Sequence, residues 1–173
     1  EDFDALDQTT QESLTHWLKK EATDAEEYKV ALNDLKTGLG FSALTGQIAA
    51  IGVLDVERNL GAVYYQSPDQ TAKADYEEDG ITFRAMDEKA MLQKFWEGAV
   101  KYQQLISFNG RAFDAPFLAV RSAVHGLRPS VNLMPYRYAT DTVHLDLLDQ
   151  LTFYGSVRRK GNLHLWSRAF SIK

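Results

Sequence analysis

The sequence predicts a mixed α/β fold in which a three-strand antiparallel meander and one parallel strand are flanked by helices. Two observations carry this prediction. Three segments with strand composition follow one another at residues 45–57, 60–66 and 81–85. From residue 87 onward the apolar residues recur at helical spacing, and a short apolar run at 104–108 precedes another helical pattern. A meander followed by helix, strand and helix indicates a crossover connection.

Two helices are expected before the first strand. Residues 9–20 have Thr9 or Thr10 as a helix cap, and residues 24–37 have Asp24 in the same position. The first of these helices carries one apolar stripe, made of Leu14, Trp17 and Leu18. Such a stripe predicts burial of that face.

The meander begins with residues 45–57, whose continuous apolar composition is typical of a buried strand. Asn59 supplies a turn before the strand at 60–66. The polar stretch 67–80 predicts a surface excursion, and 81–85 completes the meander.

The second half alternates helices and strands. Asp87 caps a helix at 87–102, the strand at 104–108 is expected to run parallel to 45–54, and a further helix covers 116–125. One face of the helix at 87–102 is apolar: Leu92, Phe95, Trp96, Ala99 and Val100.

Composition limits the functional classes. The chain has 173 residues, enough for one domain at 1–173, and no apolar run reaches the roughly 18 residues of a membrane-spanning helix. The absence of cysteine excludes disulfides and thiolate metal sites, and it fits a cytoplasmic protein. The net charge of −5 predicts that any nucleic acid contact is local or bridged by cations.

Because the chain opens on an acidic segment and ends after a helix-like stretch, we expect the domain to be incomplete at both ends.

The stretch "LISFNGRAFDAPFL" at 105–118 holds the main functional signal. Asn109 and Gly110 end an apolar run, and Asp114 follows before the next helix. The simplest interpretation is a turn followed by a helix cap at Asp114.

This stretch resembles the second motif of the DEDD 3′–5′ exonucleases, which belong to the ribonuclease-H-like superfamily. The similarity is closest to the predicted exonucleases related to the proofreading domain of family-B DNA polymerases. In that motif an Asn precedes an aromatic–Asp pair, as Asn109, Phe113 and Asp114 do here. Further stretches resemble the family in the same order: 1–20, 45–54, 95–110, 144–151 and 162–173.

The resemblance implies a ribonuclease-H-like fold and metal-dependent 3′–5′ exonuclease activity on DNA, with RNA as the alternative substrate. The implied cofactors are two Mg²⁺ or Mn²⁺ ions, which prefer carboxylate oxygens. Asp114 would be a metal ligand and a catalytic residue, and Asn109, Arg111 and Phe113 would contact the substrate. The implied partner is a nucleic acid with a 3′ end, expected to be single-stranded DNA.

The first motif of the family, Asp-x-Glu, has no match in the right place. Asp55 and Glu57 have the spacing, but they follow the stretch that resembles the second strand, so we interpret them as a solvated strand end. The resemblance places the first and third motifs outside residues 1–173.

The third motif, Tyr-x-x-x-Asp or His-x-x-x-x-Asp, also lacks a clear match. Tyr65 and Asp69 have the first spacing but precede the second motif, and His144 and Asp149 have the second spacing within a strand-to-helix segment. Asp146 is expected to cap a helix, with support of the site as the alternative. The basic cluster at 158–160 predicts a solvated loop, with a nucleic acid contact as the alternative.

Two other functional classes remain open at this point. One is a nucleic-acid-binding module with the same fold and no catalysis. The other is a scaffold domain with no nucleic acid partner.

Overall fold

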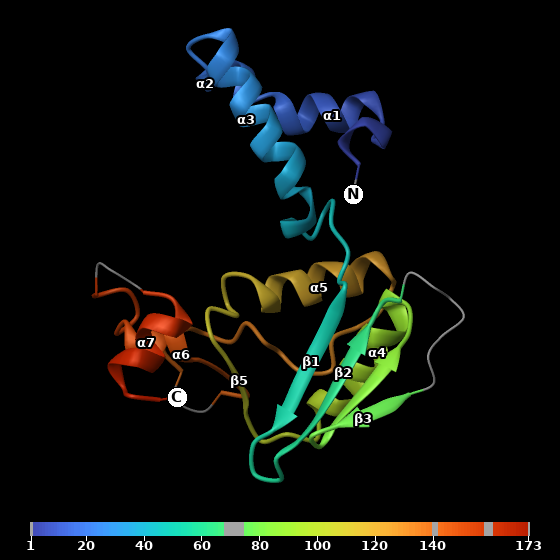
Figure 1. Ribbon diagram of the computed structural model, residues 1–173, viewed down its shortest axis with the longest axis vertical. Coiled ribbons are helices and arrows are strands. Elements are labelled where there is room, and N and C mark those ends of the chain that lie inside the picture. Colours follow the sequence, from blue (N-terminus) through green and yellow to red (C-terminus); the bar gives the residue numbers. More distant parts are fainter. Residues whose placement is uncertain (1, 68–74, 140–141, 158–160, 173) are drawn as a thin grey trace. The chain divides into compact units, whose positions relative to one another are not determined.

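The computed structural model describes residues 2–67, 75–139, 142–157 and 161–172 (Figure 1). Within it the chain forms two compact units, Glu1–Ile48 and Ala49–Lys173. The interpretation of 1–173 as one domain stays a prediction. Across the described residues, no helix combines the length and apolar composition needed to cross a membrane.

The first unit is helical. Its elements are the 3₁₀ turn η1 (Phe3–Ala5), α1 (Gln8–Thr15), α2 (Leu18–Glu21), α3 (Ala25–Gly38) and the 3₁₀ turn η2 (Leu39–Phe41). The single helix expected at 9–20 is therefore wrong, because α1 and α2 are separate helices. Trp17 between them is 50% exposed while Leu18 is 1% exposed, so the expected stripe is also broken.

The caps of this unit are local hydrogen bonds. Asp7, rather than Thr9 or Thr10, caps α1 and accepts the backbone N–H of Thr10 at 3.1 Å. Asp24 caps α3 as predicted.

The second unit contains a mixed sheet with helices around it (Figure 1). Its strands are β1 (Ala50–Asp55), β2 (Leu60–Tyr65), β3 (Tyr76–Glu78) and β4 (Ile81–Ala85), in the order β1-β2-β4-β3. β1 and β2 are antiparallel as predicted, and Asn59 in the turn between them has a φ of 53°.

The expected antiparallel pairing of the third strand is wrong, because β4 runs parallel to β2. The excursion at 67–80 is long enough to return the chain to the starting end of β2. Part of it forms β3, which pairs antiparallel with β4 and was not predicted. Asp79 and Gly80, with φ values of 49° and 78°, make the turn between β3 and β4.

The strand expected at 104–108 exists as β5 (Leu105–Ser107), but its partner was predicted wrongly. β5 pairs in parallel with β6 (His144–Asp146) in a separate two-stranded sheet, not with β1. In this register Ser107 lies beside Asp146. The ends of the two strands therefore lie next to each other.

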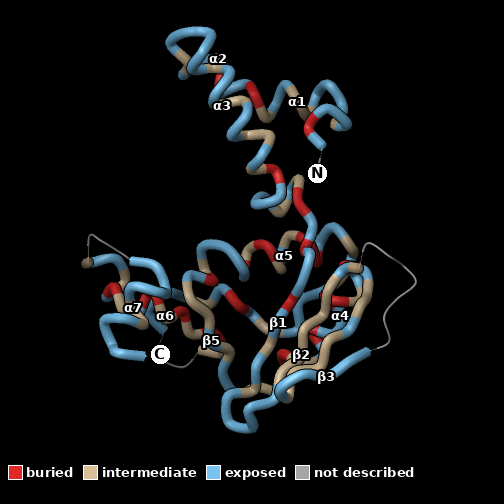
Figure 2. The backbone as a smooth tube through the Cα atoms, viewed as in Figure 1, coloured by how far each residue is buried: buried red, intermediate tan, exposed pale blue. Residues whose placement is uncertain are grey.

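The remaining helices are α4 (Glu88–Ala99), α5 (Asp114–Val124), α6 (Leu147–Leu151) and α7 (Leu163–Ala169). Asp87 caps α4, and the predicted apolar face is buried except for Val100, which lies beyond the end of α4 and is 56% exposed (Figure 2). The indole N–H of Trp96 donates to Ser122 Oγ at 2.8 Å, which ties α4 to α5.

Candidate active-site loop

The loop between β5 and α5 makes a tight turn. Asn109 has a φ of 63°, a left-handed conformation that Asn adopts more readily than most residues. The carbonyl of Asn109 accepts the N–H of Ala112 at 3.1 Å, and the carbonyl of Gly110 accepts the N–H of Ala115 at 2.7 Å. These bonds join the turn directly to the first turn of α5.

Gly110 occupies a position where a side chain does not fit. A Cβ atom there would lie 2.2 Å from Ser107 Oγ and 3.4 Å from Asp114 Oδ2. The glycine backbone therefore passes between the end of β5 and the Asp114 carboxylate. A side chain at position 110 would clash with Ser107, and glycine avoids this clash.

Asp146 fixes the loop from the end of β6. Its carboxylate accepts the backbone N–H of Asn109 at 2.8 Å and that of Arg111 at 2.9 Å, and it is 5% exposed. It also accepts the N–H of Leu148 at 2.9 Å, as the predicted helix cap of α6. Asp146 is thus confirmed as the cap of α6, and it also holds the backbone of the loop, while its support of a catalytic site stays a prediction.

Two hydrogen bonds to other protein groups hold the side chain of His144. Its Nδ1 donates to the carbonyl of Leu133 at 2.6 Å, since a carbonyl oxygen can only accept. In the neutral ring, Nε2 then accepts the hydroxyl of Ser107 at 2.8 Å. Asp149 instead binds Arg137, so the pair considered for the third motif is held by different groups.

Asp114 is the first residue of α5 and not its cap. The cap position is Phe113, with no side-chain hydrogen bond, so the expectation that Asp114 caps the helix is wrong. Asp114 is exposed, and among the described residues the structure records no hydrogen bond or ion pair of its carboxylate. An acidic side chain in the first turn is favoured by the helix dipole, whatever else it binds.

The described residues contain no group of three or more His, Cys, Asp or Glu side chains that could hold a metal ion. An exposed carboxylate such as Asp114 is a suitable oxygen ligand for Mg²⁺ or Mn²⁺. It would be one ligand of an incomplete set.

The other predicted site residues differ in how they are held. The ring of Phe113 is tilted against that of Phe117, with centroids 5.5 Å apart, and Phe113 is 43% exposed. The guanidinium of Arg111 donates to the carbonyl of Pro135 at 2.9 Å, and its Nε lies 3.6 Å from Asp149 Oδ2. Protein groups therefore already engage Arg111, and its predicted contact with substrate stays a prediction.

Arg111 also lines a polar pocket of about 240 Å³ that sequence reasoning missed. We call it the tyrosine pocket, lined by Arg111, Tyr136, Arg137, His144, Asp149 and Tyr154 among others. Arg137 forms a two-point ion pair with Asp149, which raises the pKa of Arg137 above its usual value. The alternation Tyr-Arg-Tyr at 136–138 is the signal in the sequence that could have indicated this pocket.

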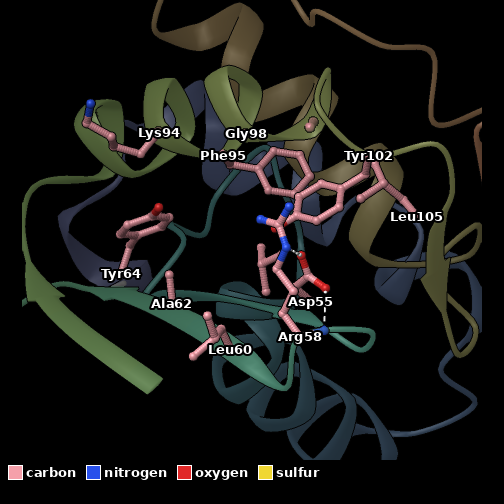
Figure 3. Close-up of a pocket in the computed structure, with 13 residues that line it drawn as sticks. Asp55, Arg58, Leu60, Ala62, Tyr64, Lys94, Phe95, Gly98, Tyr102 and Leu105 are labelled. Atoms are coloured by element: carbon pink, nitrogen blue, oxygen red, sulfur yellow. Dashed lines mark hydrogen bonds and ion pairs between the residues drawn. The ribbon is translucent and has the colours of Figure 1, made fainter. Parts of the chain in front are cut away.

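A second cavity, of about 230 Å³, lies between the β1–β2 hairpin and α4 (Figure 3). Asp55 at its edge accepts the backbone N–H of Arg58 at 3.0 Å, which supports its interpretation as a strand end before a turn. The two remaining sequence candidates, Asp69 and the cluster at 158–160, lie outside the described residues.

Comparison with family models gives one finding. The model described as "Predicted 3'-5' exonuclease related to the exonuclease domain of PolB" matches residues 70–172. The matched region contains the loop at 109–114, Asp146 and the tyrosine pocket.

Proposed function

Because the chain belongs to the family of predicted 3′–5′ exonucleases related to the exonuclease domain of PolB, we propose that it is a metal-dependent 3′–5′ exonuclease acting on single-stranded DNA. The family implies a nucleic acid substrate. The observation that supports a site in this chain is the Asn109–Asp114 loop, because Asp146 fixes its backbone while Asp114 stays exposed.

Asp114 would act as a metal ligand from the first turn of α5. Two bound Mg²⁺ or Mn²⁺ ions would supply an activated water and neutralise charge on the leaving oxygen. The carboxylate has no competing protein partner among the described residues, so metal binding there would break no recorded bond. The remaining ligands and the general base would come from residues outside 1–173, in a ribonuclease-H-like sheet.

The neighbouring residues would place the substrate. Asn109 forms the turn that precedes Asp114. Its side-chain amide, five residues before Asp114 in the chain, would contact the terminal nucleotide. Phe113, with nearly half of its surface exposed, offers a ring for base stacking. Arg111 would hold the loop through Pro135, with its remaining N–H donors available to a phosphate.

The test compares wild-type protein with Asp114→Asn, using the protein as its gene encodes it. We expect Mn²⁺-dependent shortening of 5′-labelled single-stranded DNA from its 3′ end, and loss of about 100-fold or more in Asp114→Asn, since metal stabilisation contributes several kcal/mol. Asp87→Asn is the matched control, because Asn caps a helix about as well as Asp. RNA of the same sequence tests the alternative substrate.

Full activity and unchanged Mn²⁺ affinity in Asp114→Asn would disprove the role of Asp114. Binding of DNA by the wild-type protein without any hydrolysis would instead identify an inactive nucleic-acid-binding module. Release of the 5′ label as a mononucleotide, without shortened labelled strands, would contradict the proposed polarity.

A further inference from the structure

Two tyrosine rings, those of Tyr136 and Tyr154, line the tyrosine pocket, and the ring of Tyr138 contacts both of them. The ring of Tyr138 meets Tyr136 edge to face with centroids 5.7 Å apart, and it meets Tyr154 with centroids 4.8 Å apart. Tyr136 is 74% exposed and Tyr138 is 56% exposed, while Tyr154 is half-buried. Tyr136 and Tyr138 are therefore surface side chains with ring area left to contact a ligand.

The position of Tyr154 is fixed by an unusual helix end. Phe153 and Tyr154 have φ values of 49° and 56°, a conformation that is rare for bulky residues. The N–H of Tyr154 donates to the carbonyl of Asp149 at 2.7 Å, and the N–H of Phe153 donates to that of Gln150 at 3.1 Å. These two bonds form a Schellman motif without the usual glycine, and they hold Tyr154 at the pocket.

The charge that reaches solvent in the pocket is positive. The side chain of Arg137 is 45% exposed, whereas that of its partner Asp149 is 11% exposed. Asp146 is 5% exposed and accepts three backbone N–H groups. The ion pair with Asp149 uses two of the five N–H donors of Arg137, so three donors are left for another acceptor.

The pocket is joined to the candidate active site by the loop itself. Arg111 lines the pocket, and Asp114 follows three positions later. Because consecutive Cα atoms are 3.8 Å apart, the Cα atoms of Arg111 and Asp114 lie within about 11 Å of each other. This upper limit corresponds to at most about three nucleotides at the 3.4 Å rise of a stacked strand.

We propose that the tyrosine pocket binds the single-stranded part of the substrate a few nucleotides from the scissile bond. Bases stack on Tyr136 and Tyr138, and a backbone phosphate binds the free N–H donors of Arg137. Exposed aromatic rings beside a cation are the means by which proteins bind single strands without sequence preference. The inference rests on the proposed function for the identity of the ligand, but it can be tested without catalysis.

The test measures the affinity of a fluorescent oligothymidylate of about 12 nucleotides by anisotropy in EDTA, within the usual site sizes for single strands. We expect Tyr136→Ala to weaken binding about 5- to 100-fold, and Tyr136→Phe to retain wild-type affinity because the stacking face is kept. Arg137→Gln should make the slope of log K against log salt shallower by about 0.7, the loss of one phosphate contact.

Arg84→Gln is the matched control, since Arg84 is also 45% exposed and paired with an aspartate, Asp75. It should leave affinity and salt dependence unchanged. Thermal unfolding of each variant checks that the fold is retained.

A second readout separates the pocket from the active site. Hydrolysis of the p-nitrophenyl ester of thymidine 5′-monophosphate, which has no second nucleotide to enter the pocket, should depend on Asp114 and be unaffected by Tyr136→Ala. Absence of oligonucleotide binding by the wild-type protein, or wild-type affinity in Tyr136→Ala, would overturn the pocket proposal even if hydrolysis is observed. Binding that depends on Tyr136 without any hydrolysis would support the pocket and refute the exonuclease activity.

Discussion

Asp146 Oδ2 accepts the backbone N–H of Arg111 at 2.9 Å, although 35 residues separate the two in the chain. The same carboxylate holds Asn109 through its other oxygen, so one buried side chain sets the course of the loop. Paired ends of β5 and β6 bring these groups together. The loop that presents Asp114 is thus controlled from a different strand.

Replacement of this carboxylate should loosen the loop. We expect Asp146→Ala to lower the free energy of unfolding by about 2–3 kcal/mol, because one buried and two partly buried N–H groups lose a charged acceptor. Urea denaturation measures the change. Asp87→Ala, which removes an exposed cap of α4, should cost only about 1 kcal/mol. Equal losses of stability in the two variants would show that the hydrogen bonds of Asp146 to the loop contribute no more than an exposed helix cap.

Glycine-to-alanine changes at two positions should have opposite effects. Gly110→Ala places a Cβ 2.6 Å from Ser107 Cβ, and we expect overpacking to destabilise the protein by about 1–3 kcal/mol. Gly98→Ala in α4 meets no atom within 4 Å, and the higher helix propensity of Ala should stabilise by up to about 1 kcal/mol. Thermal or urea unfolding distinguishes the two, and a neutral Gly110→Ala would contradict the close approach.

A buried ion pair links the start of α4 to α5. The carboxylate of Glu88 accepts hydrogen bonds from Arg121 Nε at 2.8 Å and from Arg121 Nη2 at 2.7 Å. Its Oε2 also lies 2.6 Å from His125 Nε2. Because Arg121 is 10% exposed, Glu88→Gln should leave a buried charge and cost about 3–5 kcal/mol in urea unfolding.

The double variant Glu88→Leu/Arg121→Met tests the cause of that loss. It removes both charges and should recover most of the stability. Glu97→Gln, which breaks the exposed pair with Lys94, should stay within about 1 kcal/mol of wild type. A double variant as unstable as Glu88→Gln would mean that packing, and not the unpaired charge, causes the loss.

The helical unit should lose stability in acid. The side-chain hydrogen bond from Thr10 lowers the pKa of Asp7, and that from Thr23 lowers the pKa of Glu27. Since both pKa values are lowered by folding, the contribution is present above the unfolded-state pKa and is lost as the pH falls through the folded-state pKa. NMR titration of the two carboxyl groups measures these values. Thr10→Val should return the pKa of Asp7 toward its ordinary value, and an unchanged midpoint would contradict the assigned cause.

Several features follow from the sequence alone because they are local. Asp24 and Asp87 cap their helices as predicted, since a cap bonds to N–H groups two or three residues away. The buried face of α4 follows from its apolar spacing, as does the end of β5 at an Asn-Gly turn. The segment at 109–114 also indicated the exonuclease family, which the match at 70–172 confirms.

Only the tertiary structure decided which distant segments meet. Composition does not encode strand direction, so the parallel pairing of β2 with β4 and that of β5 with β6 were not foreseen. The family assignment accordingly rests on the sequence match and not on the sheet. The sequence predicted a substrate contact for Arg111 and gave no sign that its guanidinium donates to the carbonyl of Pro135, 24 residues away. Such contacts depend on how strands pair and loops close, and the packing of the whole unit determines both.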